Sequence, residues 1–112
     1  METKIKVGKR EFLFETHSLA PNRFNIFELA DGKRIPAGDG IIVLGGDSVG
    51  LRNIEFKPEY RGGIGAALFR GALRFMAESF PDRKIGAYHK LVKGKPMRER
   101  QFRLGRFRKK PK

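Results

Sequence analysis

The hydrophobic pattern of this chain changes period once, and this change limits the available folds more than any other feature. Between Ile64 and Ser79, apolar and small residues recur three and four positions apart, which is the spacing of one helix face, and Pro81 follows. On either side of this segment, apolar residues instead alternate with polar ones, as is typical of strands. The pattern therefore predicts one long helix lying against a sheet, within a single domain that spans residues 1–112.

The segments before the helix predict an antiparallel meander. Turn-forming groups such as Asp31-Gly32 and Gly38-Asp39-Gly40 separate short alternating segments. The predicted strands of this half are Lys4–Val7, Glu11–Thr16, Asn22–Leu29, Ile41–Leu44 and Val49–Lys57.

The second half completes the predicted fold class. Residues 51–91 read as strand, glycine-rich turn, helix and strand (Ile85–Leu91), which is the pattern of a βαβ unit with parallel strands. Gly94-Lys95-Pro96 opens a predicted short helix that ends near Gly105. The sequence thus predicts an α/β domain with a mixed sheet, in which antiparallel N-terminal strands precede a βαβ unit and a short C-terminal helix.

The positive charge is concentrated at the C-terminal end. The chain carries 25 Lys plus Arg and 12 Asp plus Glu, a formal net charge of +13. Residues 1–80 hold 12 basic and 10 acidic side chains, whereas residues 81–112 hold 13 basic and 2 acidic. Such a field favours an anionic partner, which could be nucleic acid, a phosphorylated cofactor, an acidic protein or an anionic membrane.

The composition also excludes several kinds of site. There is no cysteine, and the longest apolar run, Ile41–Leu44, is far too short to cross a membrane. The two histidines lie far apart and no carboxylates cluster near them, so no metal site is predicted. We expect a cytoplasmic protein with no membrane span.

The turn before the helix, Pro58-Glu59-Tyr60-Arg61-Gly62-Gly63-Ile64-Gly65-Ala66, is the segment most suggestive of chemistry. Glycines at a helix start let a ligand approach the backbone, and the free N–H groups of the first turn attract an anion such as pyrophosphate. In a second interpretation, the glycines only permit a tight turn and close packing of helix on sheet. The turn matches neither a P-loop nor a dinucleotide-binding fingerprint, because the residues after its last glycine differ from both.

The run from Asn53 to Met76 resembles the acyl-CoA-binding motif of the GNAT superfamily of N-acetyltransferases. Members commonly end a strand in hydrophobic-x-Pro-x-Tyr-Arg-Gly and continue through further glycines into a helix. In this chain those positions are Phe56, Pro58, Tyr60, Arg61 and Gly62, followed by Gly63, Ile64, Gly65 and Leu68. The resemblance implies a GNAT-like fold and the transfer of an acetyl group from acetyl-CoA to an amine of a macromolecular acceptor.

The same resemblance implies a binding mode for acetyl-CoA. Backbone amides of the turn would hold the pyrophosphate, the end of the preceding strand would hydrogen-bond the pantetheine, and the two parallel strands would splay apart to admit the thioester. The implied cofactor-binding residues are Phe56, Lys57, Arg61, Gly62, Gly63, Ile64, Gly65 and Ala66.

Three side chains are candidates for acid and base catalysis. Glu55 lies on the strand leading to the motif, and alternation predicts that it faces away from the helix, toward an acceptor. Tyr88 and His89 lie near the end of the facing strand, where the splay would open. An ordinary structural role is the alternative for each of them. Phe102 falls where the family often has a tyrosine that protonates the departing thiolate.

The basic C-terminal segment, about residues 92–112, supports two interpretations. Its cations are interleaved with Phe102 and Phe107, as in a nucleic-acid-binding surface with aromatic platforms, or they form a solubilising face. The first interpretation leads to an alternative function, a catalytically degenerate GNAT-fold protein that docks on nucleic acid or a host protein. The candidate contact residues are Lys95, Arg98, Arg100, Arg103, Arg106, Arg108 and Lys109.

Overall fold

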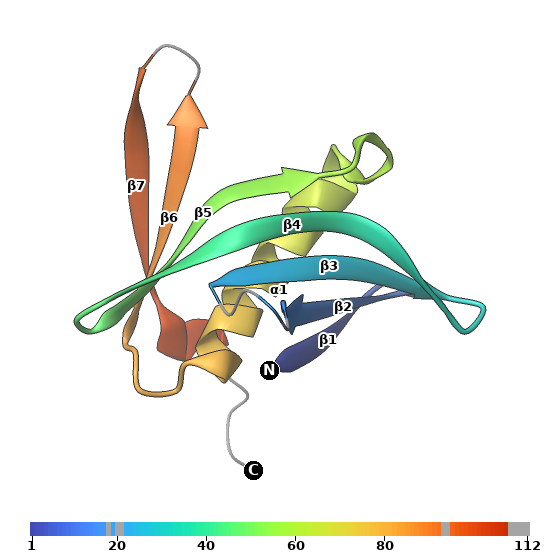
Figure 1. Ribbon diagram of the computed structural model, residues 1–112, viewed down its shortest axis with the longest axis horizontal. Coiled ribbons are helices and arrows are strands. Elements are labelled where there is room, and N and C mark those ends of the chain that lie inside the picture. Colours follow the sequence, from blue (N-terminus) through green and yellow to red (C-terminus); the bar gives the residue numbers. More distant parts are fainter. Residues whose placement is uncertain (18, 20–21, 93–94, 108–112) are drawn as a thin grey trace.

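The computed structural model describes residues 1–17, 19, 22–92 and 95–107. A curled seven-stranded sheet in the order β1-β2-β3-β4-β5-β6-β7 forms the fold, and helix α1 (Gly63–Ser79) lies against one of its faces (Figure 1). Neighbouring strands are antiparallel except β5 and β6, which run parallel and are connected through α1. The remaining elements are β1 (Glu2–Val7), β2 (Arg10–Thr16), β3 (Arg23–Ala30), β4 (Lys33–Gly45), β5 (Ser48–Phe56), β6 (Ile85–Val92), β7 (Lys95–Arg103) and the short 3-10 helices η1 (Pro58–Tyr60) and η2 (Leu104–Phe107).

The hydrophobic core lies between α1 and the sheet. The ring of Phe75 on α1 packs 5.5 Å from the ring of Phe24 on β3 and 6.0 Å from that of Phe14 on β2, measured between centroids, and all three side chains are fully buried. Each buried phenylalanine contributes roughly 1.5–3 kcal/mol to folding. This packing confirms the predicted long helix and holds its N-terminus beside the end of β5.

The predicted turn at Gly38-Asp39-Gly40 is wrong, because β4 continues through these residues without interruption. A Cβ on Gly40 would lie 2.6 Å from the ring of Phe24, and a Cβ on Gly38 would clash with the carbonyl oxygen of Glu55. Both glycines are therefore required by close packing within the sheet, so they do not mark a chain reversal.

The fold class predicted from the sequence is also wrong. The chain is a mostly antiparallel seven-stranded sheet with one α-helix among the described residues, and it does not form an α/β domain that ends in a helix. The segment predicted to be the C-terminal helix forms β7, which pairs antiparallel with β6. Without β7, the backbone N–H and C=O groups along one edge of β6 would lack this strand partner, and that pairing outweighs the helix propensity of the Arg, Glu and Gln residues in the segment.

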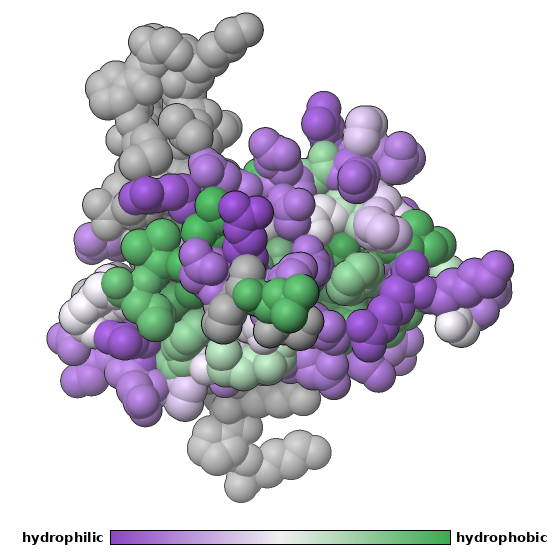
Figure 2. Space-filling model, viewed as in Figure 1, coloured by the Kyte–Doolittle hydropathy of each residue, from purple (hydrophilic) through white to green (hydrophobic). Residues whose placement is uncertain are grey.

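The outer surface is mixed in character. Hydrophilic side chains cover most of the visible face, and apolar side chains gather in smaller patches between them (Figure 2). Within the residues that the structure describes, no helix is long and apolar enough to cross a membrane.

Candidate functional site

The two parallel strands separate close to the N-terminus of α1. β5 and β6 pair as far as Arg52 and His89, whereas β5 continues to Phe56 and β6 to Val92. At the point of separation β5 carries a β-bulge, in which Asn53 has a φ of 54° and the register against β4 shifts. Because a bulge bends a strand and increases its twist, the end of β5 turns away from β6. The two strands diverge visibly in Figure 1.

Three glycines at the start of α1 differ in what the fold requires of them. Gly62 has a φ of 89°, which an L side chain adopts only with strain. A Cβ on Gly65 would lie 3.1 Å from the carbonyl oxygen of Tyr60, so packing requires a residue without one. A Cβ on Gly63 would meet nothing within 4 Å. Conformation and packing thus explain Gly62 and Gly65, whereas Gly63 leaves open space at the first residue of the helix.

The N-terminus of α1 presents an exposed partial positive charge. The N-cap residue Gly62 makes no side-chain cap hydrogen bond, and the first turn contains no acidic residue. Intrahelical bonding starts with the Ala66 N–H, so the N–H groups of residues 63–65 have no acceptor within the helix. Residues 61–63 are exposed. Several donors and the helix dipole therefore meet at one accessible point, which suits an anion with several oxygens.

The end of β5, the neighbouring part of β4 and the start of the turn line a small hollow of about 170 Å³. The N–H of Lys57 donates to the carbonyl oxygen of Ala37 at 2.8 Å, which holds the strand end on β4. The Nε of Arg61 donates to the carbonyl oxygen of Phe56 at 3.2 Å. Phe56, Lys57 and Arg61, all implied cofactor-binding residues, thus line one hollow together with Glu55.

A polar network ties η1, and with it the turn, to the sheet. The hydroxyl of Tyr60, a residue only 5% exposed, donates to Oε1 of Glu28 at 2.8 Å. Arg10 donates to both Glu28 oxygens, at 2.7 and 2.8 Å, and its guanidinium lies 5.5 Å from the centroid of the Tyr60 ring. The hydrogen bonds from Arg10 lower the pKa of Glu28, whereas burial raises the pKa of Tyr60. The carboxylate therefore stays charged and the phenol stays a donor, so the network persists at neutral pH.

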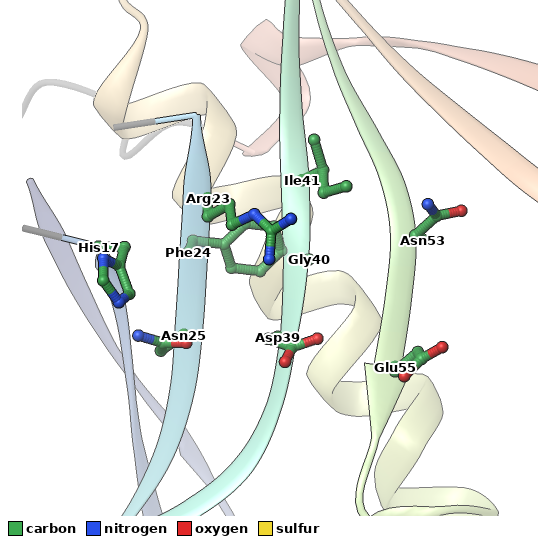
Figure 3. A pocket seen from close by; sticks show the side chains of 9 residues that line it. All are labelled: His17, Arg23, Phe24, Asn25, Asp39, Gly40, Ile41, Asn53 and Glu55. Atoms are coloured by element: carbon green, nitrogen blue, oxygen red, sulfur yellow. The ribbon is translucent and has the colours of Figure 1, made fainter. Parts of the chain in front are cut away.

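A larger cavity of about 610 Å³ lies on the sheet face opposite α1 (Figure 3), and we call it the open-face cavity. Residues of strands β3, β4 and β5 line it, together with His17, which follows β2. On β3, Arg23 and Asn25 alternate with the core residues Phe24 and Ile26. Asp39 and Glu55 are direct partners in the β4–β5 ladder, and both also line the small hollow beside Arg61. The polar residues of the open-face cavity are His17, Arg23, Asn25, Asp39, Asn53 and Glu55.

Of the three candidate catalytic residues, Glu55 has a described side chain, and this side chain lies at the site. Glu55 lies on the face opposite α1, as its alternation predicted, and contributes to both the open-face cavity and the small hollow. Tyr88 and His89 pair with Leu51 and Arg52 at the last positions before the strands separate. Their backbones lie at the point where the two strands separate, and their side chains fall outside the described part of the structure.

The other predicted binding residues are spread over the C-terminal part of the chain and the first helical turn. In α1, Ile64 is half-buried and Ala66 is exposed. Arg103 and Arg106 are exposed at the end of β7 and in η2. Lys95, Arg98 and Arg100 lie on β7 with only their backbones described, and Arg108 and Lys109 lie outside the described residues.

The two aromatic residues of the basic segment pack against the helix. The Phe102 ring lies 6.4 Å from the rings of both Phe69 on α1 and Phe107 in η2. Phe102 and Phe107 are partly buried and join the core cluster. They therefore serve packing, which weakens the prediction that they act as platforms for bases.

Sequence reasoning missed Asp39, Arg23 and Asn25, and it found no placement for His17. Asp39 lies between two glycines, and this sequence resembles a turn. The ladder pairs Asn25 with Asp39 and Asp39 with Glu55, which brings the three into one row across β3, β4 and β5. A single sequence carries no signal for such a register, because the pairing depends on residues distant in the chain.

In the part of the chain that the structure describes, no three His, Cys, Asp or Glu side chains come together in a group that could hold a metal ion. No protein-family model matches the chain, and no curated protein matches it.

Proposed function

We propose that this protein is an acyltransferase that binds acetyl-CoA at the turn of residues 61–66 and acetylates a primary amine held in the open-face cavity. The observation that carries the proposal is the separation of β5 from β6 beside an uncapped, exposed helix N-terminus, with Glu55 at the same strand end. When bound, acetyl-CoA supplies an acetyl group activated as a thioester.

The residues at the turn fit the charge of the coenzyme. The free N–H groups of residues 63–65 offer hydrogen bonds to the pyrophosphate, and the exposed Arg61 directly precedes the glycines of the turn. The side chains of Lys57 and Arg61 line the neighbouring small hollow. The open space at Gly63 lets a phosphate oxygen approach the backbone. These features support a phosphate site, because a purely structural turn would not require a glycine at 63.

The end of β5 fits the amide-containing arm of the coenzyme. Beyond Arg52, β5 has no parallel partner among the described residues, so backbone N–H and C=O groups along this stretch face the space left by β6. An extended chain with its own amide groups can add to such a free strand edge by main-chain hydrogen bonds. Pantetheine is a chain of this kind, and it would lead from the turn toward Glu55.

Among the side chains that the structure describes at the end of β5, Glu55 is placed to receive a proton. An ammonium must lose one proton before its nitrogen can attack, and a carboxylate can accept that proton directly or through one water. The amine nitrogen then bonds to the acetyl carbon as the carbon–sulfur bond breaks. Phe102 has no proton to donate and packs on α1, so we propose that water supplies the proton to the leaving sulfur. The products are the acetylated amine and free CoA thiol.

Calorimetric titration of the full chain with acetyl-CoA tests the proposal, and a parallel titration with polyuridylate tests the alternative of a nucleic-acid-binding protein. We expect saturable binding of acetyl-CoA, and the absence of binding would overturn the proposal. The release of free thiol in the presence of primary amines then measures turnover. Glu55→Gln should slow that release without changing the affinity for acetyl-CoA, whereas Glu2→Gln, an exposed control on β1, should change neither.

A further inference from the structure

We propose that the open-face cavity selects a zwitterionic acceptor, a primary ammonium that carries an anionic group close by, for which an α-amino acid is the smallest example. The proposal rests on the acetyl transfer proposed above for the chemical step. The binding itself needs no coenzyme and can be measured separately.

Asp39 and Glu55 would bind the ammonium group of the acceptor at one end of the cavity. They are direct partners on neighbouring antiparallel strands, where opposed like charges destabilise a sheet. Neither carboxylate forms an ion pair or hydrogen bond with any other described residue. Within the described residues no partner neutralises this exposed pair, and an ammonium between the two carboxylates would relieve their repulsion.

Arg23 would bind the anionic group of the acceptor at the other end of the cavity. It lines the same cavity from β3, and it makes no ion pair or hydrogen bond with another described side chain. The register pairs Arg23 with Ile41 and Asn25 with Asp39, so Arg23 and Asp39 are diagonal neighbours. Diagonal neighbours lie roughly 7–8 Å apart at Cα, a span that a long Arg side chain and one small ligand can bridge.

His17 adds a second donor near Arg23. The His17 backbone N–H donates to the carbonyl oxygen of Arg23 at 2.8 Å, which holds the two residues side by side. The Leu19 N–H donates to Nδ1 of His17 at 3.1 Å, so the neutral ring carries its proton on Nε2. Asn25 lies beside Asp39 on the side away from Glu55, with an amide that can donate or accept (Figure 3).

This division of charge excludes simpler ligands. A polyanion would meet the carboxylates of Asp39 and Glu55, and a polyamine would meet the guanidinium of Arg23. The volume of about 610 Å³ lies in the range of small-molecule sites, which leaves room for a variable side chain on the acceptor. A molecule with both charges satisfies both ends at once.

Three matched probes test the proposal by NMR titration of the isotope-labelled full chain: L-leucine, 3-methylbutylamine, which lacks its carboxylate, and 4-methylpentanoate, which lacks its amine. We expect shifts at the amides of Asn25, Asp39 and Glu55, with leucine bound at least about tenfold more tightly than either fragment, the effect of one charge-assisted hydrogen bond. No leucine binding up to its solubility, or equal binding of the amine fragment, would overturn the proposal.

Variants separate the two ends of the site. Arg23→Gln should weaken the binding of leucine about tenfold and leave the binding of 3-methylbutylamine unchanged, whereas Asp39→Asn should weaken the binding of both ligands. Asp39→Asn should also raise the Tm, because it removes a repulsion, and a lower Tm would indicate that the carboxylate serves the fold instead. Asp31→Asn, an exposed control at the β3–β4 turn, should leave all affinities unchanged. If acetyl-CoA binds and leucine does not, only this inference fails.

Discussion

Replacing Gly63 by Glu should strengthen the fold and weaken coenzyme binding. The new Cβ would meet nothing within 4 Å, and the residue occupies the first position of α1. An acidic side chain there interacts favourably with the helix dipole by about 0.3–1 kcal/mol. We therefore expect the free energy of unfolding to rise by this amount and the Tm to rise by a few degrees, measured by urea and thermal denaturation.

The same carboxylate would stand where the pyrophosphate is proposed to bind. Two unit charges about 6 Å apart repel by roughly 3 kcal/mol at an effective dielectric constant of about 20. Salt and exposure reduce this to about half, which corresponds to an affinity for acetyl-CoA that is about tenfold lower in calorimetry.

Gly105→Glu is the matched control for this change. Gly105 is also exposed, and a Cβ there would also meet nothing within 4 Å, so this variant adds the same charge away from the turn. Unchanged affinity in Gly63→Glu would refute the reasoning, because the turn would then not be the phosphate site. An equal loss in both variants would mean that net charge, and not the turn, governs binding.

Three further predictions concern the supports of the site. Tyr60→Phe removes the hydroxyl that donates to Glu28, and it should lower the free energy of unfolding measured by urea denaturation by about 1–2 kcal/mol. It should also weaken acetyl-CoA binding, because η1 loses its hydrogen bond to the sheet. The pKa of Glu28 is lower in the folded chain, so its contribution to stability is complete above the unfolded carboxyl pKa and disappears as the pH falls through the folded pKa. Wild type should therefore lose more stability on acidification than Glu28→Gln. Gly86→Ala places a Cβ 2.6 Å from the side chain of Leu104, and overpacking should cost about 1–3 kcal/mol, measured by thermal denaturation.

Each of these predictions has a contrary outcome. Equal stability of Tyr60→Phe and wild type would show that the Arg10–Glu28 pair alone holds the carboxylate and that η1 needs no anchor. Parallel pH profiles of wild type and Glu28→Gln would mean that the carboxylate contributes nothing to stability. A Gly86→Ala protein as stable as wild type would show that Leu104 can move aside without loss of contacts.

The local parts of the structure follow from the sequence because they depend on neighbours in the chain. The 3.6-residue period predicted α1, since one apolar stripe can only be buried along a helix. Alternation predicted which face Glu55 occupies, because successive side chains of a strand point to opposite sides. The glycines of the turn marked the start of α1, since Gly62 requires a positive φ and Gly65 a close approach.

Misleading local signals account for the errors. Gly38 and Gly40 resemble turn residues, although the structure uses them for packing against Phe24 and the backbone of β5. The residues of β7 have good helix propensity, although they extend the sheet. In both cases a partner distant in the chain decides the conformation, and propensity is too weak to oppose it.

The sequence by itself determined the position of the helix, the glycine turn at its start, the face on which Glu55 lies and the concentration of charge at one end. Only the tertiary structure decided that β7 completes the sheet, that β5 and β6 separate after Arg52, and that Asp39 opposes Glu55 beside Arg23. The physical reason is the separation along the chain over which each effect acts. Period and backbone conformation act within a few residues, whereas strand register and edge pairing are set by hydrogen bonds between segments that meet only when the chain is folded.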